Sequence, residues 1–216
     1  MVIAVLLINT SFSSSAESSV YRKASTSNME IALTFDDGPH PGRTPEILDI
    51  LEKYQVKATF FVIGQNVEYY PEVFKRTVDE GHEIGNHTFS HSVLKSSNAK
   101  VIEKEIHDFN NAVHSVYNKD VLTIRPPEGE FSDSLRTFAQ ENDYKIILWS
   151  VDTLDWTHRS PEKIAETVLN ETDSGDIILM HDYICGKSPT PEALEIIIPK
   201  LLERGFEFVT VSELLK

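Results

Sequence analysis

Residues 30–38, EIALTFDDG, contain the pattern that decides the fold. Ile31 to Phe35 is a short apolar and β-branched run of the kind that forms a buried strand, and two carboxylates and a glycine follow it directly. Thr44 and Pro45 then supply an N-cap and a first-turn proline, after which apolar residues recur at helical spacing. The folded part of the chain is therefore expected to begin as a strand, an acidic loop and a helix.

The alternation of strands and helices continues to the end of the chain. We expect further strands at residues 58–63, 82–86, 122–124, 145–151, 176–180 and 206–209, and helices from Pro71, over about 98–117, from Ser132, over 160 to about 169, and from Thr190. Pro199 should bend the last of these helices or end it early, and Ser212 is a candidate cap for a terminal turn.

Seven strands, mostly separated by helices, predict an α/β fold with a parallel sheet and right-handed crossovers. The pattern leaves two architectures open, a closed or distorted barrel and an open doubly wound sheet. In both, functional loops gather at the carboxyl ends of the strands. The residues that follow each strand are therefore the first place to look for chemistry.

Composition narrows the possible functions. The chain has 216 residues, of which 40% are hydrophobic and 25% charged, as expected for one globular domain. A net charge of -14 argues against nucleic-acid binding, which needs clustered Lys and Arg. Cys185 is the single cysteine, so an internal disulfide and a zinc site with two or more cysteines are both excluded.

The first residues resemble a secretory signal peptide. An apolar run from Val2 to Ile8 precedes a Ser-rich stretch that ends in a small-residue cleavage site at Ala16. The run lacks a preceding Lys or Arg, and it is far shorter than the roughly 20 residues that span a bilayer. We therefore expect an exported protein without a stable membrane span, in which residues 1–27 are a signal peptide and a disordered segment and residues 28–216 form the folded domain.

Two motifs predict a metal site. Asp36 and Asp37 end the first strand, and adjacent carboxylates repel each other unless a cation compensates, so that one can bind a metal while the other acts as a base. His87 and His91 follow the strand at 82–86, and two His four residues apart can present both imidazoles to one divalent ion. Taken singly, an Asp-Gly turn and two exposed imidazoles would be the ordinary interpretations. Their coincidence at two strand ends favours a shared metal.

Three more strand ends carry polar or aromatic residues. Residues 125–129, RPPEG, combine stiff prolines with a glycine, which suits a loop that presents a backbone amide to an oxyanion. Residues 152–156, DTLDW, bring carboxylates and an indole to the same edge, and residues 179–182, LMHD, add a histidine. Each has an ordinary reading alone, such as a proline turn, a helix-start acid, a core Trp or a strand-end His.

Taken together in this order, the five segments resemble the polysaccharide deacetylase family, also called the NodB homology family or carbohydrate esterase family 4. The resemblance covers about Glu30 to Lys216 and implies a distorted (β/α)7 barrel with its catalytic domain in residues 28–216. It implies a divalent metal, usually zinc or cobalt, held by Asp37, His87 and His91.

The resemblance also implies a role for each remaining motif residue. Asp36 would be the catalytic base, held by Arg125, and His181 would be the general acid, oriented by Asp155. The residues implied in substrate binding are Pro127, Glu128, Trp156 and Leu179, the last two around the acetyl methyl group. Members of the family commonly carry Tyr at the place of Glu128, so its side chain is expected to alter sugar preference while its backbone amide still serves the oxyanion.

The activity implied is removal of N-acetyl groups from a cell-wall polysaccharide, either peptidoglycan or chitin oligomers. The protein would then be a secreted or wall-associated monomer whose partner is an acetylated glycan. An acetylxylan esterase with the same site is the near alternative. A catalytically silent glycan-binding module is a more distant one, since the chain keeps the base, the acid and all three ligands.

Overall fold

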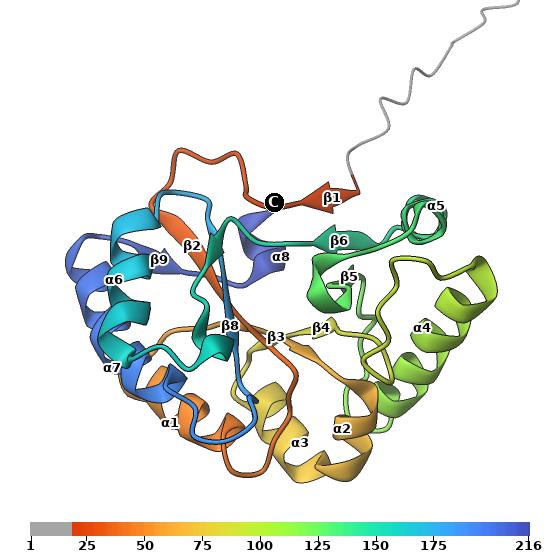
Figure 1. Ribbon diagram of the computed structural model, residues 1–216, viewed down its shortest axis with the longest axis horizontal. Helices are drawn as coiled ribbons and strands as arrows, with labels where there is room; N and C mark the ends of the chain where they lie inside the picture. The colour runs from red at the N-terminus through yellow and green to blue at the C-terminus, as the bar shows by residue number, and fades with distance from the viewer. Residues whose placement is uncertain (1–18) are drawn as a thin grey trace, which may run out of the picture.

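The strand β2 (Glu30–Asp36) lies inside a curled sheet in a computed structural model that describes residues 19–216 (Figure 1). It pairs with β3 on one side and β8 on the other, and every strand-to-strand ladder of the sheet is parallel. Across the sheet the strands are β1 (Val20–Tyr21), β6 (Lys145–Ile147), β5 (Thr123–Ile124), β4 (Glu83–Asn86), β3 (Thr59–Val62), β2, β8 (Ile177–His181) and β7 (Val151–Asp152). A further strand, β9 (Glu207–Phe208), pairs with the first residues of β2.

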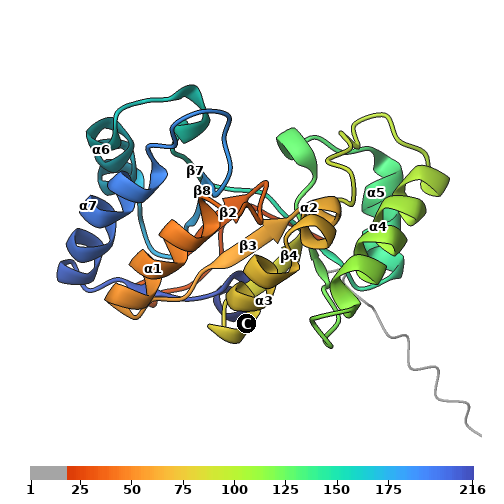
Figure 2. The same cartoon turned by 90° about the horizontal axis from the view of Figure 1, so that it is seen from below.

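The helices other than the short α8 (Val211–Leu214) cover one side of this sheet, whereas α8 packs inside the curl with Ala32 and Phe61. Figure 1 shows them in an arc that runs from α6 and α7 through α1 and α3 to α4 and α5, and Figure 2 shows α1 and α3 lying across β2, β3 and β4. Their bounds are α1 (Thr44–Tyr54), α2 (Gly64–Tyr69), α3 (Pro71–Asp79), α4 (Ala99–His114), α5 (Asp133–Glu141), α6 (Pro161–Glu171), α7 (Thr190–Glu203) and α8 (Val211–Leu214), with short 3-10 turns at η1 (Pro127–Gly129) and η2 (Asp155–Thr157). Within residues 19–216 no helix is both long and apolar enough to cross a bilayer.

Alternation along β2 explains how a buried strand can deliver polar side chains. Ile31, Leu33 and Phe35 join the main hydrophobic core with residues of the outer helices. The even-numbered residues face the other way, into the concave interior, because successive side chains of a strand point to opposite faces. There Thr34 and Asp36 both bind the guanidinium of Arg125. The strand therefore contributes to the core with one face and to the candidate site with the other.

Side chains pack closely in the concave interior, as two contacts of the Phe61 ring show. The Arg125 guanidinium carbon lies 4.1 Å from the centre of the Phe61 ring, which is close enough for a cation–π contact. A Cβ atom at Gly85 would lie 2.4 Å from the same ring. Glycine at this position of β4 therefore makes room for the aromatic floor under Arg125.

The single strand expected at 145–151 is wrong, because the chain leaves the sheet in the middle of it. β6 pairs with β5 and β1, whereas β7 pairs with β8 at the other end of the strand order. The linking residues face Arg125, which donates hydrogen bonds to the carbonyls of Ile147 and Leu148. Among the described strands no ladder joins β6 to β7, so the sheet is a curled, incompletely closed form of the expected (β/α)7 barrel.

The helix starts test the capping assignments. Ser132 caps α5 and Ser160 caps α6 through their side-chain oxygens, as predicted. Thr44, expected as an N-cap, is instead the first residue of α1, and its hydroxyl binds elsewhere. Thr210 rather than Ser212 caps α8, with Glu213 completing a capping box.

Other local expectations need correction. α2 was not anticipated, and α7 runs on past Pro199, so the proline does not end that helix early. The expected signal peptide lies almost entirely outside the described residues, but the segment 19–27, expected to be disordered, belongs to the fold. Its strand β1 pairs with β6, and Ala24 N–H donates to the Gly175 carbonyl.

Candidate metal centre and active site

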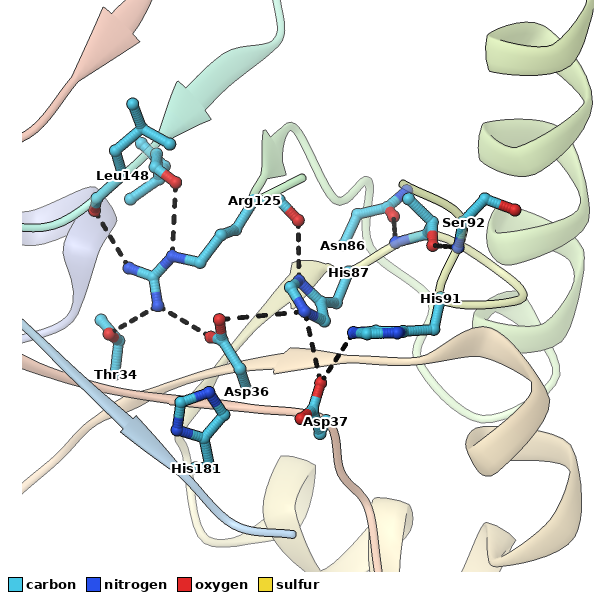
Figure 3. Close-up of polar contacts among 12 residues, drawn as sticks. Thr34, Asp36, Asp37, Asn86, His87, His91, Ser92, Arg125, Leu148 and His181 are labelled. Carbon is cyan, nitrogen blue, oxygen red and sulfur yellow. Dashed lines mark hydrogen bonds and ion pairs between the residues drawn. The ribbon is translucent and has the colours of Figure 1, made fainter. Parts of the chain in front are cut away.

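Asp37, His87 and His91 converge at the carboxyl ends of β2 and β4 (Figure 3). The Asp37 Oδ1 atom lies 3.4 Å from His87 Nε2 and 3.1 Å from His91 Nε2. Asp37 and His91 both adopt positive φ angles, of 79° and 58°, in the loops that follow their strands. The structure therefore brings together the three residues that the sequence placed at two different strand ends.

The chemistry of this donor set fits a divalent metal. Two imidazole nitrogens and one carboxylate oxygen, all within 4.8 Å of one another, are ligand types that zinc and related ions prefer. Ligands of a tetrahedral zinc ion with bonds of about 2.0–2.1 Å are separated by roughly 3.4 Å, close to the spacing found here. His87 Nδ1 lies 2.7 Å from the Arg125 carbonyl, an arrangement that leaves Nε2 free as a ligand.

Asp36 lies beside this trio but is held from the other side. Its Oδ1 accepts a 2.8 Å hydrogen bond from Arg125 Nη1, which also donates to Thr34 Oγ1 at 2.7 Å. Arg125 is fully buried, and burial lowers the pKa of its guanidinium while the Asp36 carboxylate opposes that change. Asp36 Oδ2 points toward His87 Nε2 at 3.9 Å. The second carboxylate of the pair is thus oriented next to the candidate metal by a buried cation.

His181 faces the same space from the end of β8. Its Nδ1 lies 2.8 Å from Asp155 Oδ1, and Asp155 Oδ2 accepts hydrogen bonds from the His181 backbone N–H and the Thr190 hydroxyl, both at 2.8 Å. Asp155 is fully buried. Its carboxylate therefore fixes the His181 ring through Nδ1 and leaves Nε2 directed into the pocket.

The charges around the site shift the pKa values of its groups in opposite directions. Burial alone would raise the pKa of Asp37, but hydrogen bonds from His87 and His91 oppose it and hold that pKa well below its usual range. For His181, burial lowers the pKa, but the Asp155 hydrogen bond and the nearby carboxylates prevail and raise the pKa to about 9. One side of the pocket therefore holds an ionised carboxylate, and the other a protonated imidazole.

A pocket of about 480 Å³ opens over these groups. It is lined by the predicted residues Asp36, Asp37, His87, His91, Glu128, Trp156, Leu179 and His181, and also by Trp149 and Asp152. Pro127, predicted to bind substrate, is buried in η1 and does not line the pocket. Trp149 was missed because its indole reaches the site from the irregular link between β6 and β7, which sequence periodicity assigned to a strand.

Glu128 occupies an unusual backbone conformation at the pocket rim. Its φ angle is 61°, a left-handed value that is uncommon for a residue other than glycine. Its N–H donates a hydrogen bond to no residue between 19 and 216, whereas the next two amides bind the carbonyls of Pro126 and Pro127. The loop thus presents one backbone donor at the rim, together with a carboxylate side chain.

Asp182, next to His181, is a buried acid that sequence reasoning did not assign. Its Oδ2 accepts a 2.6 Å hydrogen bond from Thr44 Oγ1, and burial raises its pKa to about 7. A Cβ atom at Gly38 would lie 2.0 Å from the same oxygen. Glycine after Asp37 therefore lets the loop of the acidic pair pack directly on Asp182.

Comparison with known proteins gives this geometry a context. A family model described as polysaccharide deacetylase matches residues 23–147. A peptidoglycan-N-acetylglucosamine deacetylase of Bacillus cereus is 43% identical over 86% of this chain and 88% of its own length. The chain also matches the peptidoglycan-N-acetylmuramic acid deacetylase PdaC of Bacillus subtilis at 41% identity, over 85% of this chain but only 38% of that longer protein.

Solved structures agree in fold and extend the range of named activities. The Bc1960 peptidoglycan N-acetylglucosamine deacetylase superposes with a TM-score of 0.89 at 37% identity, covering 91% of this chain and 92% of that one. A family 4 acetyl xylan esterase from Clostridium thermocellum, in complex with a cobalt ion, gives 0.78 at 40% identity over 86% and 89%. BA3943 from Bacillus anthracis, described as a carbohydrate esterase family 4 pseudoenzyme, gives 0.86 at 31% identity over 93% and 70%. On the family match and these similarities, the chain belongs to the polysaccharide deacetylase family.

Proposed function

We propose that this protein is a metal-dependent hydrolase that removes N-acetyl groups from cell-wall polysaccharide, with peptidoglycan as the first substrate and chitin oligomers as the second. The observation that carries the proposal is the convergence of Asp37, His87 and His91 beside an unligated Asp36 and opposite His181. Two relatives of about 40% identity that are named as peptidoglycan deacetylases support the choice of substrate.

Asp37, His87 and His91 would hold the metal, with zinc or cobalt the ions we expect. When bound there, a divalent ion supplies a Lewis acid that polarises the acetyl carbonyl. The cobalt ion in the acetyl xylan esterase structure supports the choice of metal. Residues of this chain would carry out the proton transfers and stabilise the oxyanion.

Asp36 is suited to accept the proton of the attacking water, because a hydrogen bond from Arg125 holds its carboxylate in place. His181, raised to a pKa of about 9, is protonated at neutral pH and can donate its proton to the departing amine. Asp155 holds the ring in position for that donation. The Glu128 N–H, which has no acceptor among residues 19–216, would donate to the oxyanion that forms on the acetyl oxygen. Base and acid would thus act on one carbonyl bound in the pocket that both side chains line.

The substrate end of the pocket is apolar on one side and acidic on the other. Leu179 and the half-exposed Trp156 can enclose an acetyl methyl group, and the Glu128 side chain reaches the rim. No Lys or Arg lines the pocket, while four carboxylates do. We infer that Glu128 disfavours anionic sugars. Glu128→Tyr should raise the rate on a carboxylate-bearing glycan relative to a neutral one, and unchanged relative rates would contradict this role.

An acetyl xylan esterase remains the second candidate, because the chain is similar to one over most of its length. Similarity to a pseudoenzyme raises a third, a glycan-binding protein without activity. Acetate release should be measured in parallel on peptidoglycan, N-acetylated chitooligosaccharides and acetylated xylan, with protein before and after chelation. Release from the first two alone supports the proposal. Release from xylan alone makes the protein an esterase, and no release from any of them makes it a binding protein.

We also propose that the protein acts outside the cytoplasm as a monomer. Its named relatives modify peptidoglycan, and the apolar run at 2–8 resembles an export signal. Fractionation of the source cells, with N-terminal sequencing of the extracellular form, would test both export and the expected cleavage before Glu17. Size-exclusion chromatography with light scattering would test the monomer.

A further inference from the structure

Glu105 is a buried acid on the apolar face of α4. Only 9% of its surface is exposed, and its neighbours on that face, Ile102, Ile106 and Phe109, belong to the hydrophobic core. No Lys, Arg or His of residues 19–216 forms an ion pair with it. A carboxylate is costly to bury unless hydrogen bonds replace its hydration. Its partners therefore indicate what it does.

Among residues 19–216, the hydrogen-bond donors to Glu105 all lie in one four-residue segment, Phe89 to Ser92. Oε2 accepts from the backbone N–H groups of Phe89 at 3.0 Å and Ser90 at 2.9 Å. Oε1 accepts from the hydroxyls of Ser90 at 2.8 Å and Ser92 at 3.0 Å. Phe89 and Ser90 lie between the metal-site histidines His87 and His91, and Ser92 directly follows His91. One side chain from a separate helix thus binds the residues on both sides of His91.

The connection between His87 and His91 needs such an anchor, because its backbone is irregular. Thr88 and His91 both adopt left-handed φ angles, of 66° and 58°, which β-branched and bulky residues rarely do. Neither the Phe89 nor the Ser90 N–H bonds to a backbone carbonyl of the described chain, so Glu105 is their acceptor. Without it, two backbone N–H groups would lose their acceptor in the protein, and the left-handed turn would lose its support.

The two histidines are held in different ways. The His87 ring is fixed through Nδ1, which lies 2.7 Å from the Arg125 carbonyl. The His91 ring is 42% exposed, and among residues 19–216 its only polar contact is the one from Nε2 to Asp37. Its position therefore depends on its backbone, which the Glu105 network holds through Ser90 on one side and Ser92 on the other.

We propose that Glu105 is a positioning residue for the metal site, which holds His91 at the ion through hydrogen bonds to the segment 89–92. This inference rests on the metal site of the proposed function. According to the proposal, α4 contributes to metal affinity through Glu105, although it supplies none of the three ligands. Partners that orient metal ligands typically contribute about 10- to 100-fold to metal affinity.

The test is zinc affinity, measured by competition with a chromophoric chelator on folded protein well below its melting temperature. Glu105→Met keeps the approximate volume and removes both acceptors, and it should raise the zinc dissociation constant by about 10- to 100-fold. Glu105→Gln should stay within about 3-fold, because its carbonyl can accept from both N–H groups while its amide donates to the rotatable serine hydroxyls. Glu103→Met, on the exposed face of the same helix, is the matched control and should leave affinity unchanged.

Cobalt supplies a second measurement, since its visible absorption reports coordination geometry. Glu105→Met should alter that spectrum at saturating cobalt, and Glu103→Met should not. If Glu105→Met does not fold, the double change Ser90→Ala and Ser92→Ala removes two donors to the carboxylate and should still weaken zinc binding by about 3- to 10-fold. Wild-type zinc affinity in Glu105→Met overturns the proposal. If Glu105→Met does not fold, wild-type zinc affinity in the double variant overturns it. A wild-type protein that binds neither ion overturns the proposed function instead.

Discussion

Replacing Asp155 by Asn should lower the pKa of the His181 imidazole to its ordinary value or below. The Asp155 carboxylate lies 2.8 Å from His181 Nδ1 and is the strongest of the groups that raise the pKa of His181 to about 9. Asn keeps the shape and one acceptor oxygen but removes the charge. Burial, which lowers the pKa, would then be opposed only by the carboxylates of Asp36 and Asp37. We therefore expect the pKa in Asp155→Asn to fall to the ordinary value of about 6.5 or below.

The magnitude follows from the size of the shift. A fall from about 9 to about 6.5 corresponds to about 3 kcal/mol of lost stabilisation of the imidazolium, since one pKa unit is about 1.4 kcal/mol. At pH 7.5 the protonated fraction of His181 would fall from nearly all molecules to less than roughly a tenth. If His181 is the general acid, the alkaline limb of the pH–rate profile should move to lower pH.

The assay is an NMR titration of the His181 ring in metal-free protein. Asp152→Asn is the matched control, because Asp152 lines the same pocket but is not among the groups that act on His181. The control should titrate like the wild type. A pKa that stays near 9 in Asp155→Asn would refute the reasoning, since the charge of Asp155 could then not be its source.

Three further outcomes are expected. Arg125→Met should lower the free energy of unfolding in urea by about 3–5 kcal/mol, because it leaves the buried Asp36 carboxylate without its cation; a loss below 1 kcal/mol would contradict this. Burial lowers the pKa of His82 to about 4, so the folded protein binds this proton less tightly than the unfolded chain does. The contribution of neutral His82 to stability is therefore complete above about pH 6.5 and is lost as the pH falls toward 4. Between pH 7 and pH 5, the free energy of unfolding of His82→Gln in the same urea assay should therefore fall by about 2 kcal/mol less than that of the wild type. Equal falls would contradict the low pKa. Trp156→Ala should raise KM for a chitooligosaccharide by about 10-fold with a smaller change in kcat, through lost apolar contact; an unchanged KM would remove Trp156 from the substrate side.

Much of the site was accessible from sequence, because parallel strands share one carboxyl edge. Asp37 and His91 are far apart in the sequence, but each follows a buried strand, and β2 and β4 lie on either side of β3, so that their carboxyl ends reach the same edge of the sheet. The helix caps Ser132 and Ser160 were predictable for a similar reason, since they depend on neighbours within one turn. Local patterns therefore predicted most of the element order and a metal site at two strand ends, and the family resemblance identified the three ligands.

Features set by long-range contacts were not predicted. The run 145–151 is mostly apolar, but the carbonyls of Ile147 and Leu148 accept hydrogen bonds from the buried Arg125, and the run is divided into two strands. Thr190 was treated only as a helix start, although its hydroxyl binds Asp155 from 35 residues away. Glu105 did leave a signal, because it is an acid at an otherwise apolar position of its helix. A buried acid needs hydrogen-bond donors, but the sequence does not identify which residues supply them.

The most direct test of the metal centre is anomalous diffraction at the zinc absorption edge, on crystals of the protein grown with zinc. We expect one strong peak bonded to Asp37 Oδ1, His87 Nε2 and His91 Nε2, with the carboxylate of Asp36 nearby but not bound to the ion. A peak at another place, or none at these three atoms, would contradict the proposed chemistry.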